Sequence, residues 1–450
     1  MTSRLLVRDR RAAAVSLLLA AGTLACAASR PPANRPAGNP PEEIRSAAGL
    51  IAKWHVDPVE AGELVRIAVL AIEAEAGAAA RGEGAASDDL AAALNAAVAR
   101  LRAARPELDD DRVVGLAVQA MAASLDDGSH FIEPAQWRRI FAHAAHPAER
   151  PGGFGLVVVA GVPFPTVLRV LPGTPAAAAG LEPGSELQSV DGSTTSGLAL
   201  DEVVELLQGP VGSEARLTIG ARGGASRDLR LRRAAIDVGQ VDCRVLGGRI
   251  LYLGLQALGG RTAERVRGFA AAPGEPARWV ILDLRGNTGG LLDAATSLAD
   301  AFLESGPILS VEDPRGSETY RAKPGTSPLE RARLAILVDE RTGSGAEAVA
   351  AAMQDNGRGT VIGNRTAAVA SIQQVYEIAG GALRLTVAHL VRASGERIDG
   401  RGVDPDVLVD LRAPPPATPL ADVACPAFAS PAPVSRDPAV ARAASVLLAN

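Results

Sequence analysis

The chain has 450 residues, of which 47% are hydrophobic but only 3% are aromatic, and its formal net charge is -5. This length exceeds one ordinary hydrophobic core and predicts about three domains, whose interiors must be filled mostly by Ala, Val and Leu. The small acidic excess gives no basic surface of the kind that nucleic-acid-binding proteins carry, so nucleic acid is not expected as a partner.

Residues 1–27 have the layout of a signal peptide. Arginines precede an apolar run from residue 12 to about residue 25, and this run is shorter than the roughly 20 residues that a membrane-spanning helix needs. Cys26 follows Thr23-Leu24-Ala25, which is close to a bacterial lipoprotein signal, although ordinary cleavage before Ala28 fits as well. We therefore expect an exported protein of the periplasm or cell envelope, with a membrane contact only through a lipid at Cys26.

A Pro-rich tether (28–41) is expected to lead into a helical N-terminal domain (42–148), because apolar residues recur there at helical spacing. The stripes are Ile44, Ala48 and Ile51, followed by Leu64, Ile67, Ala68 and Ile72. Such stripes are typical of a plain core and indicate no chemistry. His143 and His146 have near-helical spacing, but the local pattern offers no carboxylate or cysteine beside them, so no metal site is expected.

Between residues 150 and 236 the pattern changes to short β-type runs separated by glycine. The expected order is strand, strand, short helix, strand, turn, longer helix and two strands, with P-A-x-x-A-G-L-x-P-G at 175–184 and V-D-G at 190–192. In this order and with these turns, the segment resembles a PDZ domain.

The PDZ resemblance implies a binding loop at Gly153, Phe154, Gly155 and Leu156. Successive backbone N–H groups of such a loop receive the carboxylate of a chain terminus, while the bound peptide adds as a strand. Taken alone, the sequence G-G-x-G would be an ordinary glycine turn; the surrounding pattern favours the binding loop.

Residues 237–412 alternate buried-type strands with helices, which predicts an α/β core. The expected strands are 249–258, 278–286, 334–340, 360–365, 373–379 and 383–390, and the expected helices are 261–272 and 291–305. Residues 413–450 form a Pro-rich segment and a C-terminal helix. Apart from Cys26, the cysteines are Cys243 and Cys425. In an oxidising compartment these two can form a disulfide, but connectivity does not follow from sequence alone.

Ser344 lies in the glycine-flanked stretch TGSGAEAV, which enters the last helix of the core. Ser344 and Glu347 have the spacing of a helix capping box, and that alone explains both residues. A second interpretation is that Ser344 is a nucleophile, because Gly343 and Gly345 leave little bulk around its hydroxyl and the helix presents its positive end to an oxyanion.

Four segments occur in the order found in the C-terminal processing peptidases, also called tail-specific proteases. They are MAASLDDGSHFIEPAQW at 121–137, LDLRGNTGG at 282–290, GSGAEAVAAAMQDNGR at 343–358 and SGERIDGRGVDPDV at 394–407. The chain resembles this family across nearly all of its mature part. The resemblance implies a multidomain α/β and β fold, with a helical N-terminal region, a PDZ domain and a ClpP/crotonase-like α/β peptidase core.

By this resemblance Ser344 stands at the nucleophile position. The implied oxyanion hole consists of the backbone N–H groups of Gly345 and Gly290. Neither a cofactor nor a metal is expected.

The general base is where the chain departs from the family. The family's lysine stands 25 residues after the serine, where this chain has Val369, and both adjacent glycines are replaced by Ala368 and Ala370. Gln373, at the position that orients the lysine, is retained. Arg365 is no substitute, because a guanidinium stays protonated and cannot accept the serine proton.

Two functions follow from this departure. One is a pseudopeptidase that binds the C-terminal tails of exported or envelope proteins through its PDZ domain without cleaving them. The alternative is an active serine endopeptidase that uses Ser344 with another base, for which His389, oriented by Asp404 or Asp406, is the candidate. Substrate and oligomeric state do not follow from the sequence, which is compatible with a homo-oligomer.

Overall fold

The computed structural model divides into two compact units, which are described separately. The described residues are 39–77, 88–126, 128–134, 137, 152–159, 161–171, 173–198, 200–220, 225–236, 241–246, 250–271, 277–325, 328–379, 381–409 and 437–449. The expected signal peptide, Cys26, Cys425, the pair of His143 and His146, and most of both Pro-rich segments lie outside them. Among the described helices, none is both long and apolar enough to span a membrane.

Helices dominate the N-terminal part of the larger unit. Those described are α1 (Pro40–Trp54), α2 (Ala61–Glu75), α3 (Leu90–Ala104) and α4 (Asp110–Ala123). The predicted apolar stripes are confirmed for Ile44, Ile51, Leu64 and Ile72, which are fully buried in one hydrophobic cluster, whereas Ile67 is only half-buried.

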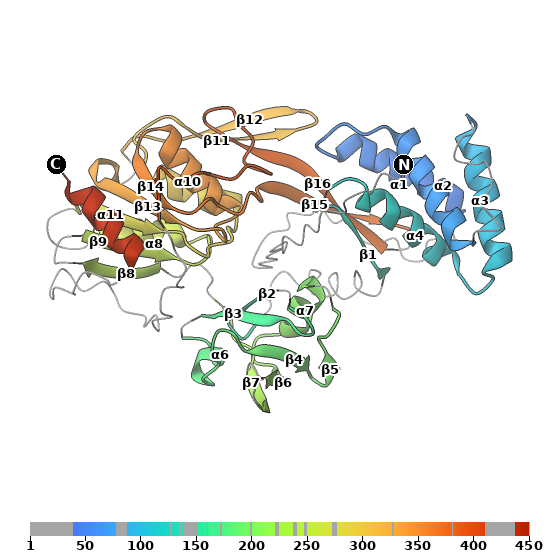
Figure 1. Cartoon of the computed structure of the whole chain (residues 1–450), viewed down its shortest axis with the longest axis horizontal. Helices are drawn as coiled ribbons and strands as arrows, with labels where there is room; N and C mark the ends of the chain where they lie inside the picture. The colour runs from blue at the N-terminus through green and yellow to red at the C-terminus, as the bar shows by residue number, and fades with distance from the viewer. Residues whose placement is uncertain are drawn as a thin grey trace, which may run out of the picture. The chain divides into compact units, whose positions relative to one another are not determined.

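These helices pack on an antiparallel sheet with the order β1-β16-β11-β12, in which β15 also pairs with β16. Its strands are β1 (His130–Ile132), β11 (Pro307–Asp313), β12 (Gly316–Arg321), β15 (Ser371–Ile378) and β16 (Gly381–Arg392). Leu383 and Leu385 of β16 belong to the cluster of the helices, whereas Leu390 belongs to the cluster of the core. One long strand therefore connects the two (Figure 1).

The core of the same unit is a sheet with the order β17-β14-β13-β10-β9-β8, parallel except for β8. The strands are β8 (Val241–Leu246), β9 (Ile250–Leu255), β10 (Trp279–Asp283), β13 (Arg333–Val338), β14 (Gly359–Gly363) and β17 (Val407–Leu408). The helices are α8 (Thr262–Ala270), α9 (Leu292–Asp300), α10 (Gly345–Asp355) and α11 (Pro438–Leu448), with a 3-10 turn at Pro328–Arg331.

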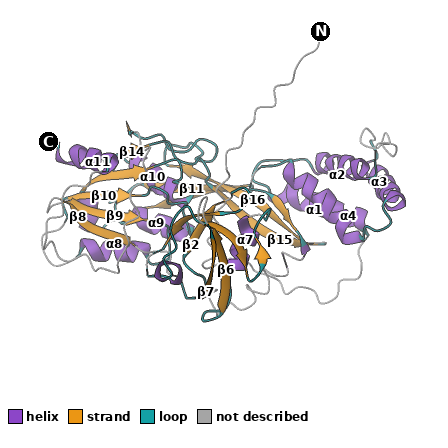
Figure 2. Cartoon of the chain, turned by 60° about the horizontal axis from the view of Figure 1, so that its bottom comes forward, coloured by secondary structure: helices purple, strands orange, loops and turns teal. Residues whose placement is uncertain are grey.

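The two faces of the core sheet are covered by different helices. Leu282 and Ile336 face the cluster that contains α8, α9 and α10, whereas Ile281 and Leu337 face the cluster that contains α11. Figure 2 shows α8 and α11 on opposite sides of β9 and β10. This alternation explains the nearly continuous apolar runs in the sequence, because strands covered on both faces have no polar side. Cys243 of β8 takes part in a disulfide bond whose other cysteine lies outside the described residues.

The smaller unit has the element order predicted for residues 150–236. Its elements are β2 (Leu156–Val159), β3 (Thr166–Val170), α6 (Pro175–Ala178), β4 (Glu186–Val190), β5 (Ser193–Thr194), α7 (Leu200–Leu207), β6 (Glu214–Gly220) and β7 (Ser226–Arg232). The strands form an antiparallel sheet around one hydrophobic cluster of its own.

A buried histidine joins the N-terminal helices to β16. His55 is 5% exposed; its Nε2 lies 2.8 Å from Oδ2 of Asp126, and its Nδ1 lies 2.8 Å from the carbonyl oxygen of Asp57. Both neighbours are acceptors, so both ring nitrogens donate and the imidazolium is the form that fits. Asp126 also accepts a hydrogen bond of 2.8 Å from the Thr386 hydroxyl on β16.

These contacts shift two pKa values. Burial by itself lowers the pKa of His55, but its hydrogen bonds to Asp126 and to the Asp57 carbonyl outweigh burial and raise that pKa above 6.5. Burial raises the pKa of Asp126, yet hydrogen bonds from His55, Thr386 and Ser129 lower it to about 2. The contribution of His55 to stability is therefore complete below the pKa of the unfolded chain and is lost as the pH rises through the folded value; that of Asp126 is lost only as the pH falls toward its lowered value.

We predict that His55→Gln lowers the free energy of unfolding by about 2 kcal/mol near pH 6 and by less near pH 9, because the wild type loses its imidazolium over that range. Urea unfolding across this range measures the difference. Asp126→Asn serves as the control background, in which His55→Gln should show little pH dependence. A difference that is constant with pH would show that folding leaves the pKa of His55 unchanged, and a difference that grows toward pH 9 would show that His55 is neutral in the folded protein.

Candidate active site

Ser344 lies at the turn between β13 and α10, in a strained backbone conformation. Its φ is 53° and its ψ is -124°, and L-residues rarely adopt positive φ. Its amide donates to the carbonyl oxygen of Val369 at 2.8 Å and to Oε2 of Glu347 at 3.0 Å. The second bond is the carboxylate half of the capping box that the sequence predicts. The turn leaves the Ser344 side chain half-buried at the entrance of the helix.

The glycine loop after β10 packs directly against this turn. A Cβ on Gly289 would lie 2.7 Å from Cβ of Ser344 and 2.8 Å from the amide nitrogen of Gly345, and one on Gly290 would lie 2.1 Å from the carbonyl oxygen of Leu258. Only glycine fits at either position. The structure thus brings Gly290 and Gly345, the two implied oxyanion residues, into the immediate surroundings of Ser344.

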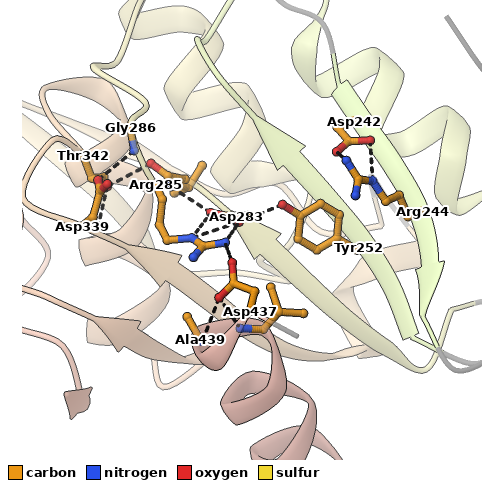
Figure 3. A network of polar contacts seen from close by, with 12 residues as sticks. Asp242, Arg244, Tyr252, Asp283, Arg285, Gly286, Asp339, Thr342, Asp437 and Ala439 are labelled. Atoms are coloured by element: carbon orange, nitrogen blue, oxygen red, sulfur yellow. Dashed lines mark hydrogen bonds and ion pairs between the residues drawn. The ribbon is translucent and has the colours of Figure 1, made fainter. Parts of the chain in front are cut away.

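Buried polar residues hold the glycine loop and the serine turn together. The amide of Gly343 donates to the carbonyl oxygen of Asn287 at 2.9 Å, and the Asn287 side chain accepts from Gly289 at 2.9 Å. Asp339 accepts from the amide of Gly286 at 2.7 Å, and both residues are drawn in Figure 3. Asn287 and Asp339 were not singled out from the sequence; Asn287 lies in the LDLRGNTGG segment, which was the available signal.

Glu347 ties a third segment to the serine turn. Its carboxylate is fully buried and accepts from the Thr366 hydroxyl at 2.5 Å and from the amides of Ala368 at 2.7 Å and Val369 at 3.0 Å, besides that of Ser344. Burial raises the pKa of Glu347, although all four of these hydrogen bonds act to lower it. The carboxylate therefore serves as a hub between α10 and residues 366–369.

Residue 369 meets Ser344 through its backbone. The Val369 side chain is 47% exposed and apolar. Before it, Ala368 has a φ of 61°, a left-handed conformation that suits glycine; after it, Ala370 is fully buried. Arg365 points its guanidinium to the carbonyl oxygen of Arg401, so its charge is used elsewhere.

Gln373 is already engaged on β15. Its Oε1 accepts from Arg384 at 3.0 Å, and its Nε2 donates to the Ser371 hydroxyl at 2.9 Å. The chain's two lysines lie on the surface: Lys53 places its ammonium 4.8 Å from the ring centre of Trp54, and Lys323 follows β12.

The expected partners of His389 were wrong. His389 is 6% exposed, and its Nε2 lies 3.3 Å from Oδ2 of Asp57. Asp57 belongs to the connection between α1 and α2. Asp406 instead accepts from Gln354, and Asp404 accepts from the same side chain through its carbonyl oxygen. The carboxylate that orients His389 is thus more than three hundred residues away from it in the sequence, and no local sequence signal indicated this pair.

In the smaller unit, the glycine loop at 153–155 presents free backbone donors. Gly153 donates to the carbonyl oxygen of Ala234 at 2.9 Å, but the amides of Phe154 and Gly155 have no acceptor in the described part of the chain. Gly155 has a φ of 79°, and a Cβ there would lie 2.4 Å from Thr174.

As for metals, the described residues contain no group of three His, Cys, Asp or Glu that could hold an ion.

Comparison with known proteins identifies the fold and family. Residues 249–409 match peptidase family S41, and residues 166–219 match a PDZ domain. The carboxy-terminal-processing protease of Bartonella bacilliformis is 33% identical over 316 residues, which cover 68% of this chain and 71% of that protein. This chain belongs to peptidase family S41.

Two other similar proteins extend the comparison. Carboxyl-terminal-processing peptidase 2 of Arabidopsis thaliana is 31% identical over 315 residues, which cover 65% of this chain and 59% of that protein. The solved structure of a photosystem II D1 C-terminal processing protease is 24% identical and has a TM-score of 0.56, covering 83% of this chain and 94% of that one. The multidomain α/β fold with a PDZ domain and an S41 core is therefore shared.

We predict that Ala368→Gly stabilises this S41 protein by about 0.5–1 kcal/mol, because a left-handed alanine costs about 1–2 kcal/mol and the added flexibility of glycine offsets only part of the gain. Chemical unfolding measures the change. Ala367→Gly is the matched control. Because Ala367 does not have a positive φ, this substitution should destabilise the protein by about 0.5–1 kcal/mol. Equal destabilisation by both substitutions would show that Ala368 is unstrained.

Proposed function

We propose that this S41 protein is exported, binds protein C-termini through its PDZ domain, and has lost most or all of its proteolytic activity. One observation carries the last part: the residue expected to be the general-base lysine is Val369. An apolar side chain cannot accept the hydroxyl proton of Ser344, and a serine without an acceptor is a poor nucleophile at neutral pH.

The surroundings of Ser344 support a catalytic site that keeps its geometry but lacks its general base, rather than one whose parts have moved apart. The glycine loop still packs against the serine turn, and Glu347 still holds residue 369 beside Ser344. Removing one member of a serine peptidase's catalytic group leaves only the residual acceleration from the oxyanion hole and binding. We therefore propose that the binding parts have been retained while proton transfer has been lost.

We predict that the wild type and Ser344→Ala degrade an unfolded substrate protein at the same rate. Val369→Lys combined with Ala368→Gly should raise the rate at least about tenfold, since it supplies an amine at the expected place. The gain stays small because a half-exposed lysine is mostly protonated at neutral pH.

The control for the gained activity is the same double substitution with Ser344→Ala added, which should be inactive. Cleavage by the wild type that disappears in Ser344→Ala would contradict the proposal. In that case another group accepts the proton, and the alternative of an active endopeptidase holds.

Tail binding is supported by two amides of the PDZ loop that have no acceptor among the described residues, and by a glycine at a φ that other residues rarely adopt. These two adjacent N–H groups lie immediately before β2 and have no acceptor in the part of the chain that the structure describes, which suits them to a terminal carboxylate. A bound peptide would then lie beside β2 and extend its sheet. We expect the bound tails to end in an apolar residue and to belong to exported or envelope proteins.

We predict that full-length Ser344→Ala protein binds a free-acid peptide with an apolar last residue at least about tenfold more tightly than the amidated peptide, because charge-assisted hydrogen bonds to the carboxylate are lost on amidation. Isothermal titration calorimetry measures both affinities. Gly155→Ala should abolish the difference, since its Cβ would clash with Thr174. Gly192→Ala is the matched control, with a φ of 80° and no atom within 4 Å of its Cβ. Equal affinity for both peptides would refute carboxylate recognition.

A further inference from the structure

The C-terminal helix α11 lies beyond the segment that matches the S41 family, which ends at residue 409. Its apolar face packs on the core sheet through Val440, Ala443 and Leu447. Asp437 caps its N-terminus by accepting hydrogen bonds from the amides of Ala439 at 2.9 Å and Val440 at 3.3 Å. Ordinary packing and capping explain these contacts without any link to the serine site.

Asp437 makes one further contact, and it is buried. Its Oδ2 lies 2.8 Å from Nη2 of Arg285, which also forms hydrogen bonds with Asp283, including one of 2.9 Å from Nε to Oδ1 (Figure 3). The side chains of Arg285 and Asp283 are 5% exposed, and that of Asp437 is 9% exposed. One guanidinium is thus held between two carboxylates, where water cannot replace either of them.

Arg285 stands at the start of the glycine loop. The next residue, Gly286, donates its amide to Asp339, and the preceding residue, Leu284, accepts through its carbonyl oxygen from the Thr342 hydroxyl at 2.9 Å. Both contacts belong to the connection between the glycine loop and the serine turn. A shift of the Arg285 backbone would therefore displace both the glycine loop and the serine turn.

We propose that Asp437 is a positioning residue for the serine site: its charge fixes Arg285 and, through Arg285, the loop that carries Gly289 and Gly290. Without this charge, Arg285 keeps a single carboxylate partner in a site that excludes water. A buried donor that loses its charge-assisted acceptor is unfavourable, so the Arg285 side chain and the start of the loop become more mobile. The proposal does not depend on whether the site cleaves peptides or only resembles one that does.

Asp437→Asn separates the charge from the cap. Asparagine is as good an N-cap as aspartate, so α11 keeps its start while Arg285 loses a counter-ion. Arg442→Gln is the matched control, because it removes one charge from the exposed side of the same helix. Hydrogen–deuterium exchange of the full-length protein reports on residues 286–290, 342–346 and 438–448 separately.

The expected result is that Asp437→Asn accelerates amide exchange in 286–290 at least about tenfold while α11 stays protected, and that Arg442→Gln changes neither segment. The ¹⁵N resonance of the Arg285 Nε should shift in Asp437→Asn only, and Asp437→Glu should return it toward the wild-type position. Unchanged exchange in 286–290, or acceleration confined to α11, would overturn the proposal and leave Asp437 as a cap.

A measurement on the wild type covers the case in which Asp437→Asn does not fold. Native-state exchange at increasing denaturant concentration should show that 286–290 and the first turn of α11 open in one cooperative step. Opening of α11 at lower denaturant than 286–290 would equally overturn the proposal. Neither experiment uses cleavage or peptide binding as its readout, so each can fail independently of the proposed function.

Discussion

The geometry around Ser344 depends on one buried carboxylate. Glu347 accepts four hydrogen bonds, and three of them come from Thr366, Ala368 and Val369. A carboxylate at this depth is tolerated only while its acceptor sites are filled. Residues 366–369 therefore cannot move away from the serine turn without leaving a charge unsatisfied. Even the strained φ of Ala368 is maintained by this requirement, because its amide is one of the four donors.

Much of this architecture could be predicted from the sequence, because its signals are local. The glycine turns and short strands predicted the element order of the PDZ unit, and the apolar stripes predicted the N-terminal helices. The strands β1, β8, β11, β12 and β17 were missed, and β1 lies in a segment that was expected to be helical. Residues 316–321 (GSETYR) are polar and mostly exposed, so their strand depends on pairing with β11 rather than on any apolar pattern of their own.

The long-range polar contacts of the larger unit could not be predicted for a different reason. His389 meets Asp57, Thr386 meets Asp126, and Arg285 meets Asp437, and the partners in each pair are far apart in the chain. Sequence patterns report on neighbours within a few turns or strands, whereas these pairs depend on how the sheets bring distant segments together. The same contacts link the N-terminal helices and the C-terminal helix to the two sheets, and no short motif contains both partners of any of these pairs.

The attachment of residue 369 through its backbone has an evolutionary consequence. Its amide and carbonyl oxygen make the contacts with Glu347 and Ser344, while its side chain extends partly into solvent. Selection for a folded protein therefore places almost no constraint on which side chain stands there. The side chain at position 369 can therefore change while the backbone amide and carbonyl oxygen keep the hydrogen bonds that they make here. Similarity of fold consequently carries no information about the side chain at position 369, on which the proposed function depends.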